Sequence, residues 1–344
     1  MRLARGISTF VLATALSLPL VACGSSGDDD DDTGDDVGNE CYDDPGACVD
    51  PTGSDTQYVA DTITMPTSAT QAQQLGIDLD GDPQGRPDNA LGQILSTLAS
   101  QGDINLQESI NEQVNDGGLI LLFNLKATGL TTAVDAGGWI YLGDNPSPEP
   151  CTTADPPVCG QHLSGQGTFD VAASSPTDAV LHGDIIGSKL TGGPGKVTLE
   201  LALGDIDPIT VNMIGARMEV NVATTALTSG KIGGAVTQAE LDNNVLPAIV
   251  TVMDESISED CLGAAPTCCT EGSTGETLID LFDEDDDCAV SLEELRTNDL
   301  ISSLLSPDVD LLDENGDFNP RVDEVKDSLS LGIGFSAVGA SFTP

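Results

Sequence analysis

The sequence has few basic residues, few aromatic residues and no long hydrophobic run. Lys and Arg number 11 against 57 Asp and Glu, and the formal net charge is -46. Nucleic-acid binding and electrostatic docking on anionic lipid both need clustered basic side chains, so this balance argues against both. Aromatic residues make up only 3% of the chain, whereas 38 Gly and 19 Pro favour turns. This composition indicates a β-rich fold more than a helical bundle.

Several signatures of enzymes and metal enzymes are also missing. The chain contains no His-Glu-x-x-His, Gly-x-Ser-x-Gly or Ser-x-x-Lys motif. The glycine-rich stretch 192–196 is followed by Val197, where a phosphate-binding loop needs Ser or Thr, so we expect a hairpin turn there. The absence of a Cys-x-x-Cys pair argues against zinc.

The N-terminal residues are typical of an export signal. Arg2 and Arg5 precede an apolar run from Ile7 to Leu20, which is too short to cross a bilayer. Residues 20–23 resemble the lipobox of bacterial lipoproteins, with a branched apolar residue three positions before Cys23 and a small residue just before it. The resemblance implies that the signal is removed before Cys23 and that this cysteine carries the lipid.

The residues after Cys23 predict a location and a tether. Gly24 and Ser25 stand where an inner-membrane retention signal has Asp, so we expect the outer membrane, on its periplasmic or surface face. Residues 23–57 contain 12 acidic and no basic residues. Such a charged, polar segment cannot bury a core, and we expect it to be disordered.

The cysteine count agrees with export. Nine cysteines are present, and lipidation of Cys23 leaves an even number, which predicts four disulfides. Local pairing is expected between Cys41 and Cys48 and between Cys151 and Cys159.

The last four cysteines allow three connectivities. Adjacent cysteines rarely bond to each other, so Cys268 and Cys269 are expected to have separate partners. Cys261 and Cys288 should therefore each take one of them, and the sequence does not choose between the two arrangements.

The segment 58–260 alternates apolar and polar residues in the manner of β-strands. About nine strands are expected, in rows that include residues 119–125, 197–203, 209–213 and 218–222. Helices interrupt the strands near residues 89, 105 and 237, and Pro247 should kink or split the last of these. We predict a mainly β (α+β) fold with an antiparallel β-sandwich-like body and inserted helices.

Residues 283–294 resemble an EF-hand calcium loop. Calcium prefers six to eight oxygen ligands, and this loop offers oxygens at the required spacing. An entering helix capped by Ser273 and an exit helix from Ser291 through Leu305 would complete a helix–loop–helix EF-hand segment. The ligands implied by the resemblance are Asp283, Asp285 and Asp287, the carbonyl of Ala289, Ser291 through water, and Glu294.

Position six of this loop departs from the usual pattern. Cys288 stands where Gly normally allows a left-handed backbone, at a cost of about 1 kcal/mol. We expect a disulfide from Cys288 to Cys268 or Cys269 to hold the loop and make the site rigid. Calcium should then shift the melting curve strongly and the circular dichroism little.

Two further loops are candidate calcium sites. Residues 273–328 carry 18 acidic and 3 basic residues, so bound cations would relieve strong self-repulsion. The second candidate loop offers Asp313, Asn315, Asp317, Asn319 and Glu324 as ligands. Its match to the calcium-loop pattern is imperfect, because Phe318 and Pro320 depart from the usual residues. Asp308 and Asp310 are alternative ligands. The third candidate loop offers Asp78, Asp80, Asp82 and Asp88, and it resembles the loops of thrombospondin-type calcium repeats. The alternative is an Asp-rich turn before a helix that binds no metal.

The sequence thus predicts five segments. They are a signal peptide (1–22), an acidic tether (23–57), a β-sandwich body (58–260), a disulfide-held EF-hand segment (261–328) and a C-terminal strand returning to the sandwich (329–344). The expected function is a calcium-binding, lipid-anchored envelope protein with a binding or structural role. The alternative is a calcium-dependent carbohydrate-active enzyme or an adhesin, with a protein or polysaccharide partner that the sequence does not specify.

Overall fold

The computed structural model describes residues 49–81, 85–101, 106–201, 208–263, 265, 267–321 and 324–344. Every described residue belongs to one compact unit, Asp36–Pro344. Several sequence predictions lie outside the described residues: the signal at 1–22, the lipid-bearing Cys23, the pair Cys41 and Cys48, and Asp82.

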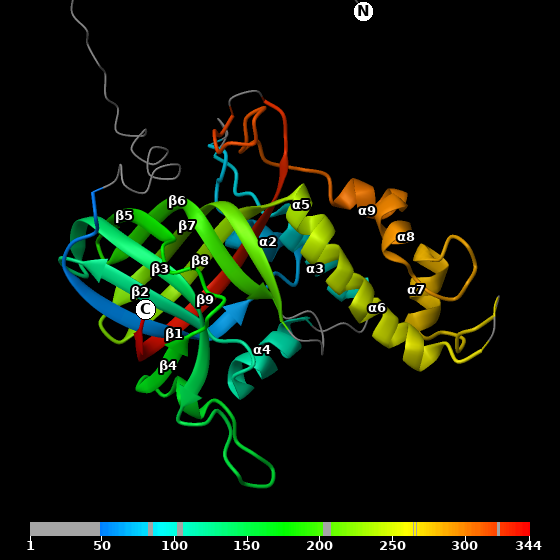
Figure 1. Ribbon diagram of the computed structural model, residues 1–344, viewed down its shortest axis with the longest axis horizontal. Helices are drawn as coiled ribbons and strands as arrows, with labels where there is room; N and C mark the ends of the chain where they lie inside the picture. Colours follow the sequence, from blue (N-terminus) through cyan, green and yellow to red (C-terminus); the bar gives the residue numbers. More distant parts are fainter. Residues whose placement is uncertain are drawn as a thin grey trace, which may run out of the picture. The chain divides into compact units, whose positions relative to one another are not determined.

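Eight antiparallel strands close into a barrel (Figure 1). Each strand pairs with the next, and the last pairs back with the first, so the order is β1 (Ser54–Thr64), β2 (Leu121–Ala127), β3 (Thr132–Ser147), β5 (Val180–Ile186), β6 (Lys189–Leu201), β7 (Ile209–Ala223), β8 (Ala226–Thr237) and β9 (Ser328–Thr343). The short β4 (Gly167–Val171) pairs with β3 and runs parallel to β9. The predicted β-sandwich is therefore wrong, because the strands form one closed sheet.

Irregularities in the strands explain how the sheet can close. The register shifts within β1, β3, β6, β7 and β8, and such bulges increase the local twist and bend that a barrel needs. In β7 the break falls at Gly215, whose φ of 58° suits glycine. Buried positions are Val211 and Met213 before it but Met218 and Val220 after it. Residues 209–213 and 218–222, which the sequence indicated as two separate strands, are thus parts of one strand. The side chains that face the core are at odd-numbered positions before Gly215 and at even-numbered positions after it.

The barrel encloses a packed core. The main hydrophobic cluster takes buried residues from all eight barrel strands, and within it the rings of Phe123 on β2 and Phe335 on β9 stack with their centroids 4.5 Å apart. Residues that alternate with these core positions along the strands point outward. Among them, Leu122 of β2 and Tyr141 of β3 pack in a separate cluster with Phe169 of β4 and Phe342 of β9. Inward and outward apolar faces therefore both stabilise this part of the barrel.

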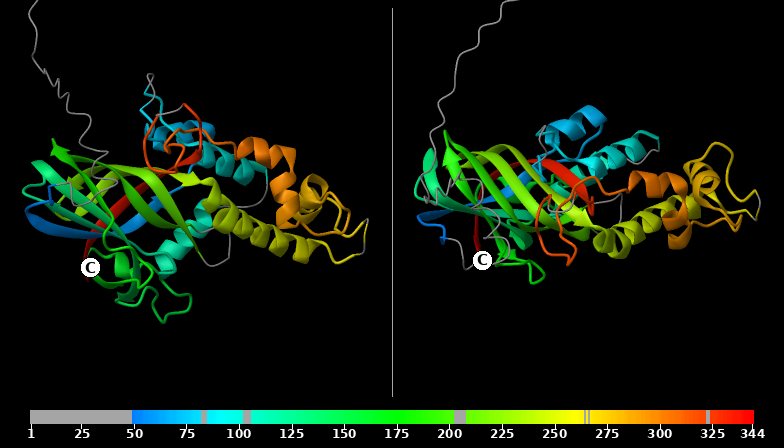
Figure 2. Two further views of the ribbon diagram at one scale, coloured as in Figure 1. Left: turned by 45° about the horizontal axis from the view of Figure 1, so that its top comes forward. Right: turned by 90° about the horizontal axis from the view of Figure 1, so that it is seen from above.

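The helices lie in two connections between strands (Figures 1 and 2). Between β1 and β2 lie α2 (Ala69–Leu75), α3 (Ala90–Gln101) and α4 (Leu106–Asp116), and between β8 and β9 lie α5 (Gln238–Glu240), the π-helical η2 (Leu241–Val245), α6 (Leu246–Asp260), α7 (Thr274–Phe282), α8 (Leu292–Thr297) and α9 (Asp299–Leu304). A 3₁₀ turn, η1 (Gln161–Leu163), precedes β4. Helix α3 contacts β9, α4 contacts β1, and α6 packs against α7 and α8. Within the described part of the chain, none of the helices has the length and apolar character needed to cross a membrane.

The helix that was predicted to be kinked or split at Pro247 changes from α to π geometry just before this residue. Thr237 caps the short α5, whose backbone continues through the π-helical turn η2 before α6 begins at Leu246. Pro247 lies in the first turn of α6, directly after the π-helical turn, and it has no N–H to donate to a carbonyl of that turn.

The region around the acidic loop corrects the predicted EF-hand architecture. The exit helix does not run through Leu305, because α8 stops at Thr297 and Asn298 adopts an extended conformation (φ −61°, ψ 124°). The side chain of Asn298 accepts hydrogen bonds from the N–H groups of Leu300 and Ile301 and thereby starts α9. This capping bond replaces the continuation of α8, so two short helices stand where one EF-hand helix was predicted.

Candidate metal centres

Helix caps fix both ends of the acidic loop 283–294. Ser273 Oγ accepts from the N–H of Glu276 at the start of α7, which leads into the loop. At the far end Ser291 and Glu294 form a capping box, in which Glu294 Oε2 accepts from Ser291 N at 2.7 Å and Ser291 Oγ accepts from Glu294 N at 3.1 Å. Both predicted caps are confirmed, and they hold the Glu294 carboxylate beside the loop.

Buried apolar residues fasten the loop to the rest of the fold. Phe282, Val290 and Leu295 flank or follow the acidic residues, and all three are buried in the main hydrophobic cluster. Arg296 on α8 also donates a hydrogen bond to the carbonyl of Asp242. The loop backbone is therefore set by packing on the body of the protein as well as by its own caps.

Three aspartates converge inside this loop. One carboxylate oxygen from each of Asp283, Asp285 and Asp287 lies within 4.8 Å of the others. Oxygens on opposite sides of one calcium ion are about 5 Å apart, since each lies about 2.3–2.6 Å from the ion. Asp283 also accepts from the N–H groups of Asp287 and Cys288, which orients its carboxylate within the turn.

The electrostatics of the loop show what crowding these carboxylates costs. Loss of solvent and repulsion from Asp287, Glu294 and Asp283 raise the pKa of Asp285. Desolvation also acts to raise the pKa of Glu294, but hydrogen bonds from Ser291 and from the backbone of Glu284 outweigh it and lower that pKa. Glu294 is thus held charged next to a group whose charge is disfavoured, and a bound cation would relieve this conflict.

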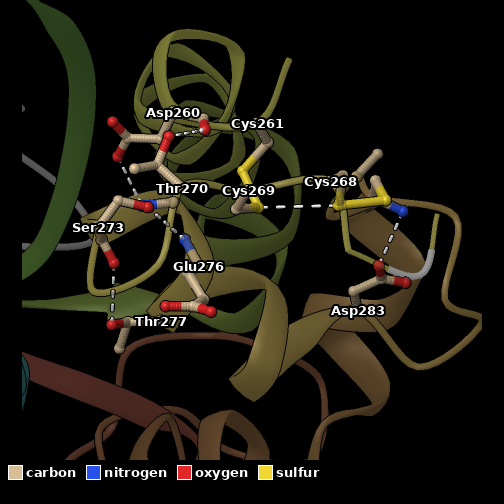
Figure 3. The surroundings of a disulfide bond; sticks show 12 residues. Asp260, Cys261, Cys268, Cys269, Thr270, Ser273, Glu276, Thr277 and Asp283 are labelled. Carbon is tan, nitrogen blue, oxygen red and sulfur yellow. Dashed lines mark hydrogen bonds between the residues drawn. A yellow bond between two sulfur atoms is a disulfide. The ribbon is translucent and has the colours of Figure 1, made fainter. Parts of the chain in front are cut away.

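One disulfide joins this loop to the segment that follows α6, and a second lies within that segment (Figure 3). Cys268 bonds Cys288 within the loop, and Cys261 at the end of α6 bonds Cys269. The sequence left open which of the adjacent residues Cys268 and Cys269 bonds to Cys288, and in the structure it is Cys268. The predicted disulfide between Cys288 and one of these two cysteines is therefore confirmed. Cys288 has the expected left-handed backbone, with a φ of 72°. A further predicted disulfide, Cys151–Cys159, is also present.

Ser291 and Ala289, the other two predicted ligands in this loop, are both engaged in hydrogen bonds. Ser291 Oγ is engaged in the helix cap, so any contact with an ion would use its other lone pair. Ala289 donates its N–H to Asp287 Oδ1 at 3.0 Å, which closes the turn between the third aspartate and residue 289.

The second predicted loop is a tight turn, and among the described residues its acids do not gather in a group of three. Asp313 accepts from the N–H groups of Asn315 and Asp317, and these bonds lower its pKa. The backbone of Asn319 bonds back to Leu311, while Glu324 lies beyond the turn with a φ of 59°. Phe318, which breaks the calcium-loop pattern, is buried instead in a small apolar cluster.

The third predicted loop does bring its acids together. Asp78, Asp80 and Asp88 each place a carboxylate oxygen within 4.8 Å of the others. Burial, and then repulsion from Asp80, Asp308 and Asp78, raise the pKa of Asp88 to about 7, although Leu79 N donates to its Oδ2.

The sequence did not reveal the surroundings of this third cluster. Arg217 of β7 is close enough for Asp78 to act on its pKa, and Asp308 acts in the same way on Asp88. These residues lie far apart in the sequence and meet only because β7, the loop after α2 and the segment before β9 pack together. No local pattern could have indicated that contact.

Comparisons with models of protein families, with curated proteins and with solved structures gave no significant match to this chain.

Proposed function

We propose that this protein is a calcium-binding, lipid-anchored protein of the bacterial cell envelope with a binding or structural role. The observation that carries the proposal is the convergence of Asp283, Asp285 and Asp287 beside Glu294 in one capped and disulfide-bonded loop. Carboxylate and carbonyl oxygens without nitrogen or sulfur ligands favour a hard cation such as calcium.

Calcium in this loop would stabilise the fold and leave its conformation largely unchanged. The ligands are the four carboxylates of Asp283, Asp285, Asp287 and Glu294, with the carbonyl of Ala289 and a water held by Ser291 completing the set. The caps, the Cys268–Cys288 bond and the buried flanking side chains already fix the backbone, so the ion mainly offsets repulsion between carboxylates.

The envelope location depends on the sequence of residues 1–23. The apolar run, the residues before Cys23 and the even number of remaining cysteines all favour export and lipidation. Several acyl chains on Cys23 would anchor the protein stably, since each buried methylene contributes about 0.8 kcal/mol.

Calorimetric titration with calcium tests the loop directly. Glu294→Gln keeps an oxygen for the helix cap but removes the charge, and it should eliminate the binding event of this loop. Glu293→Gln, on the same helical turn and exposed to solvent, makes the same change in net charge and should leave the titration unchanged. Equal titrations for Glu294→Gln and the unmodified chain would refute the assignment.

A further inference from the structure

The described parts of the loop between α2 and α3, residues 76–81 and 85–89, hold three aspartates. Ile77 and Asp88 form an antiparallel bridge, with Asp88 N donating to Ile77 O at 3.0 Å. The carboxylate of Asp88 accepts from Leu79 N, and that of Asp78 accepts from Gly81 N, both at 2.8 Å. These bonds turn both carboxylates toward the space that Asp80 also occupies, where the three groups lie within 4.8 Å of one another.

Asp80 is the unusual member of this cluster. The residue is only 9% exposed, and its Oδ1 accepts no hydrogen bond from any residue that the structure describes. A buried carboxylate oxygen without a donor costs the full desolvation of a charged group. Two further carboxylates with oxygens within 4.8 Å add repulsion to this cost, and a cation bound at Asp80 would offset both.

The surrounding structure holds the three aspartates in place. Asn89, next to Asp88, is buried and exchanges hydrogen bonds with the backbone of Gly332 on β9. Ile77 and Leu79 are buried in a small cluster with Leu311 and Phe318, and Arg321 donates to the carbonyl of Gly81. The described parts of the loop are thus fixed between the barrel and the segment that precedes β9, and a ligand would meet preformed oxygens.

We propose that Asp78, Asp80 and Asp88 bind a calcium ion in a second, buried site that fastens the loop after α2 to the barrel. All the side chains that converge there offer oxygen, which selects a hard divalent cation over zinc or copper. Each carboxylate oxygen that already accepts one hydrogen bond keeps a second lone pair for the ion. This site is independent of the loop 283–294 and of the function proposed for it.

Two other ways of relieving the repulsion give different experimental results. A proton shared between two of the carboxylates would neutralise one charge and leave no calcium site. Arg217 of β7 could instead supply a positive charge near Asp78. With either alternative, calcium binding would not depend on Asp80.

Calcium titration of the purified chain, followed by melting in chelator, separates these cases. Asp80→Asn keeps the shape of the side chain but removes its charge, and Asp178→Asn changes an exposed aspartate outside both clusters. We expect Asp80→Asn to weaken one calcium-binding event by more than about tenfold, which is the lower limit for the loss of even an outer-shell partner. Asp178→Asn should leave every binding event unchanged. In chelator the Asp80→Asn variant should melt at a higher temperature than the unmodified chain, because a buried, unpaired charge is gone.

The remaining outcomes are also decisive. If Asp80→Asn fails to fold, Asp88→Asn replaces it, because the introduced amide retains an oxygen for the N–H of Leu79. If the variant that folds, Asp80→Asn or Asp88→Asn, shows as many calcium-binding events as the unmodified chain, the proposal is overturned. Loss of one event in Asp80→Asn together with an unchanged titration for Glu294→Gln would support this site and refute the function proposed for the loop 283–294.

Discussion

Replacing Asn89 with alanine should lower the free energy of unfolding by about 3–5 kcal/mol. The side chain is 1% exposed, and it makes four hydrogen bonds to backbone groups of Ala72, Gly92 and Gly332. Alanine would leave buried donors and acceptors unpaired, at about 1–3 kcal/mol each, and would remove the cap of α3. For a fold of this size we expect the melting temperature to fall by roughly 10 °C.

Chemical denaturation measured by circular dichroism checks this expectation. Asn221→Ala is the matched control, because Asn221 is exposed on β7, and it should change the unfolding free energy by less than about 0.5 kcal/mol. Equal stabilities for Asn89→Ala and Asn221→Ala would show that Asn89 does not join α2, α3 and β9 as described.

Removing calcium should lower the melting temperature without unfolding the protein. A site in the presence of calcium at about 100 times its dissociation constant adds about 2.7 kcal/mol, so loss of the ion from the loop 283–294 should lower the melting temperature by roughly 5–10 °C. The far-ultraviolet circular dichroism should hardly change, because caps and disulfides already fix this backbone.

Differential scanning calorimetry with and without chelator measures this shift. A variant that combines Glu294→Gln with Asp80→Asn lacks both proposed sites, and chelator should leave its melting temperature unchanged. A chelator effect of equal size in this double variant and in the unmodified chain would assign the stabilisation to other residues.

Local features of the fold could be predicted from the sequence because their causes are local. Ser273 and Ser291 cap helices through bonds that span three residues, and Cys288 takes a left-handed backbone because the turn between acidic positions demands it. The bond from Cys288 to one of two adjacent cysteines also followed from short-range reasoning.

Closure of the barrel could not be predicted in the same way. Alternating apolar residues are the same in a sandwich and in a barrel, and the difference lies in which strands meet. The pairing of β1 with β9 joins residues near 60 to residues near 337, and no local pattern encodes it. The change of phase at Gly215 even looked like the gap between two strands.

For the candidate metal sites too, the sequence could predict features with local causes but not those that depend on remote residues. The spacing of Asp283, Asp285 and Asp287 indicated a cluster, because neighbouring residues in one turn must lie close together. The spacing of Asp78, Asp80 and Asp88 indicated a second one, but it could not show that Asp80 would be buried without a hydrogen-bond donor for Oδ1 among the described residues. Burial of that kind depends on β7, β9 and the segment between α9 and β9, which are remote in sequence.

Native mass spectrometry of the chain in calcium tests the central claim most directly, because it counts bound ions on the intact protein. The unmodified chain should carry calcium that survives transfer into the gas phase, and Glu294→Gln should carry one ion fewer while Glu293→Gln carries the full number. A chain that remains metal-free at saturating calcium, or a Glu294→Gln variant with the full number of ions, would contradict the proposed calcium site in the loop 283–294.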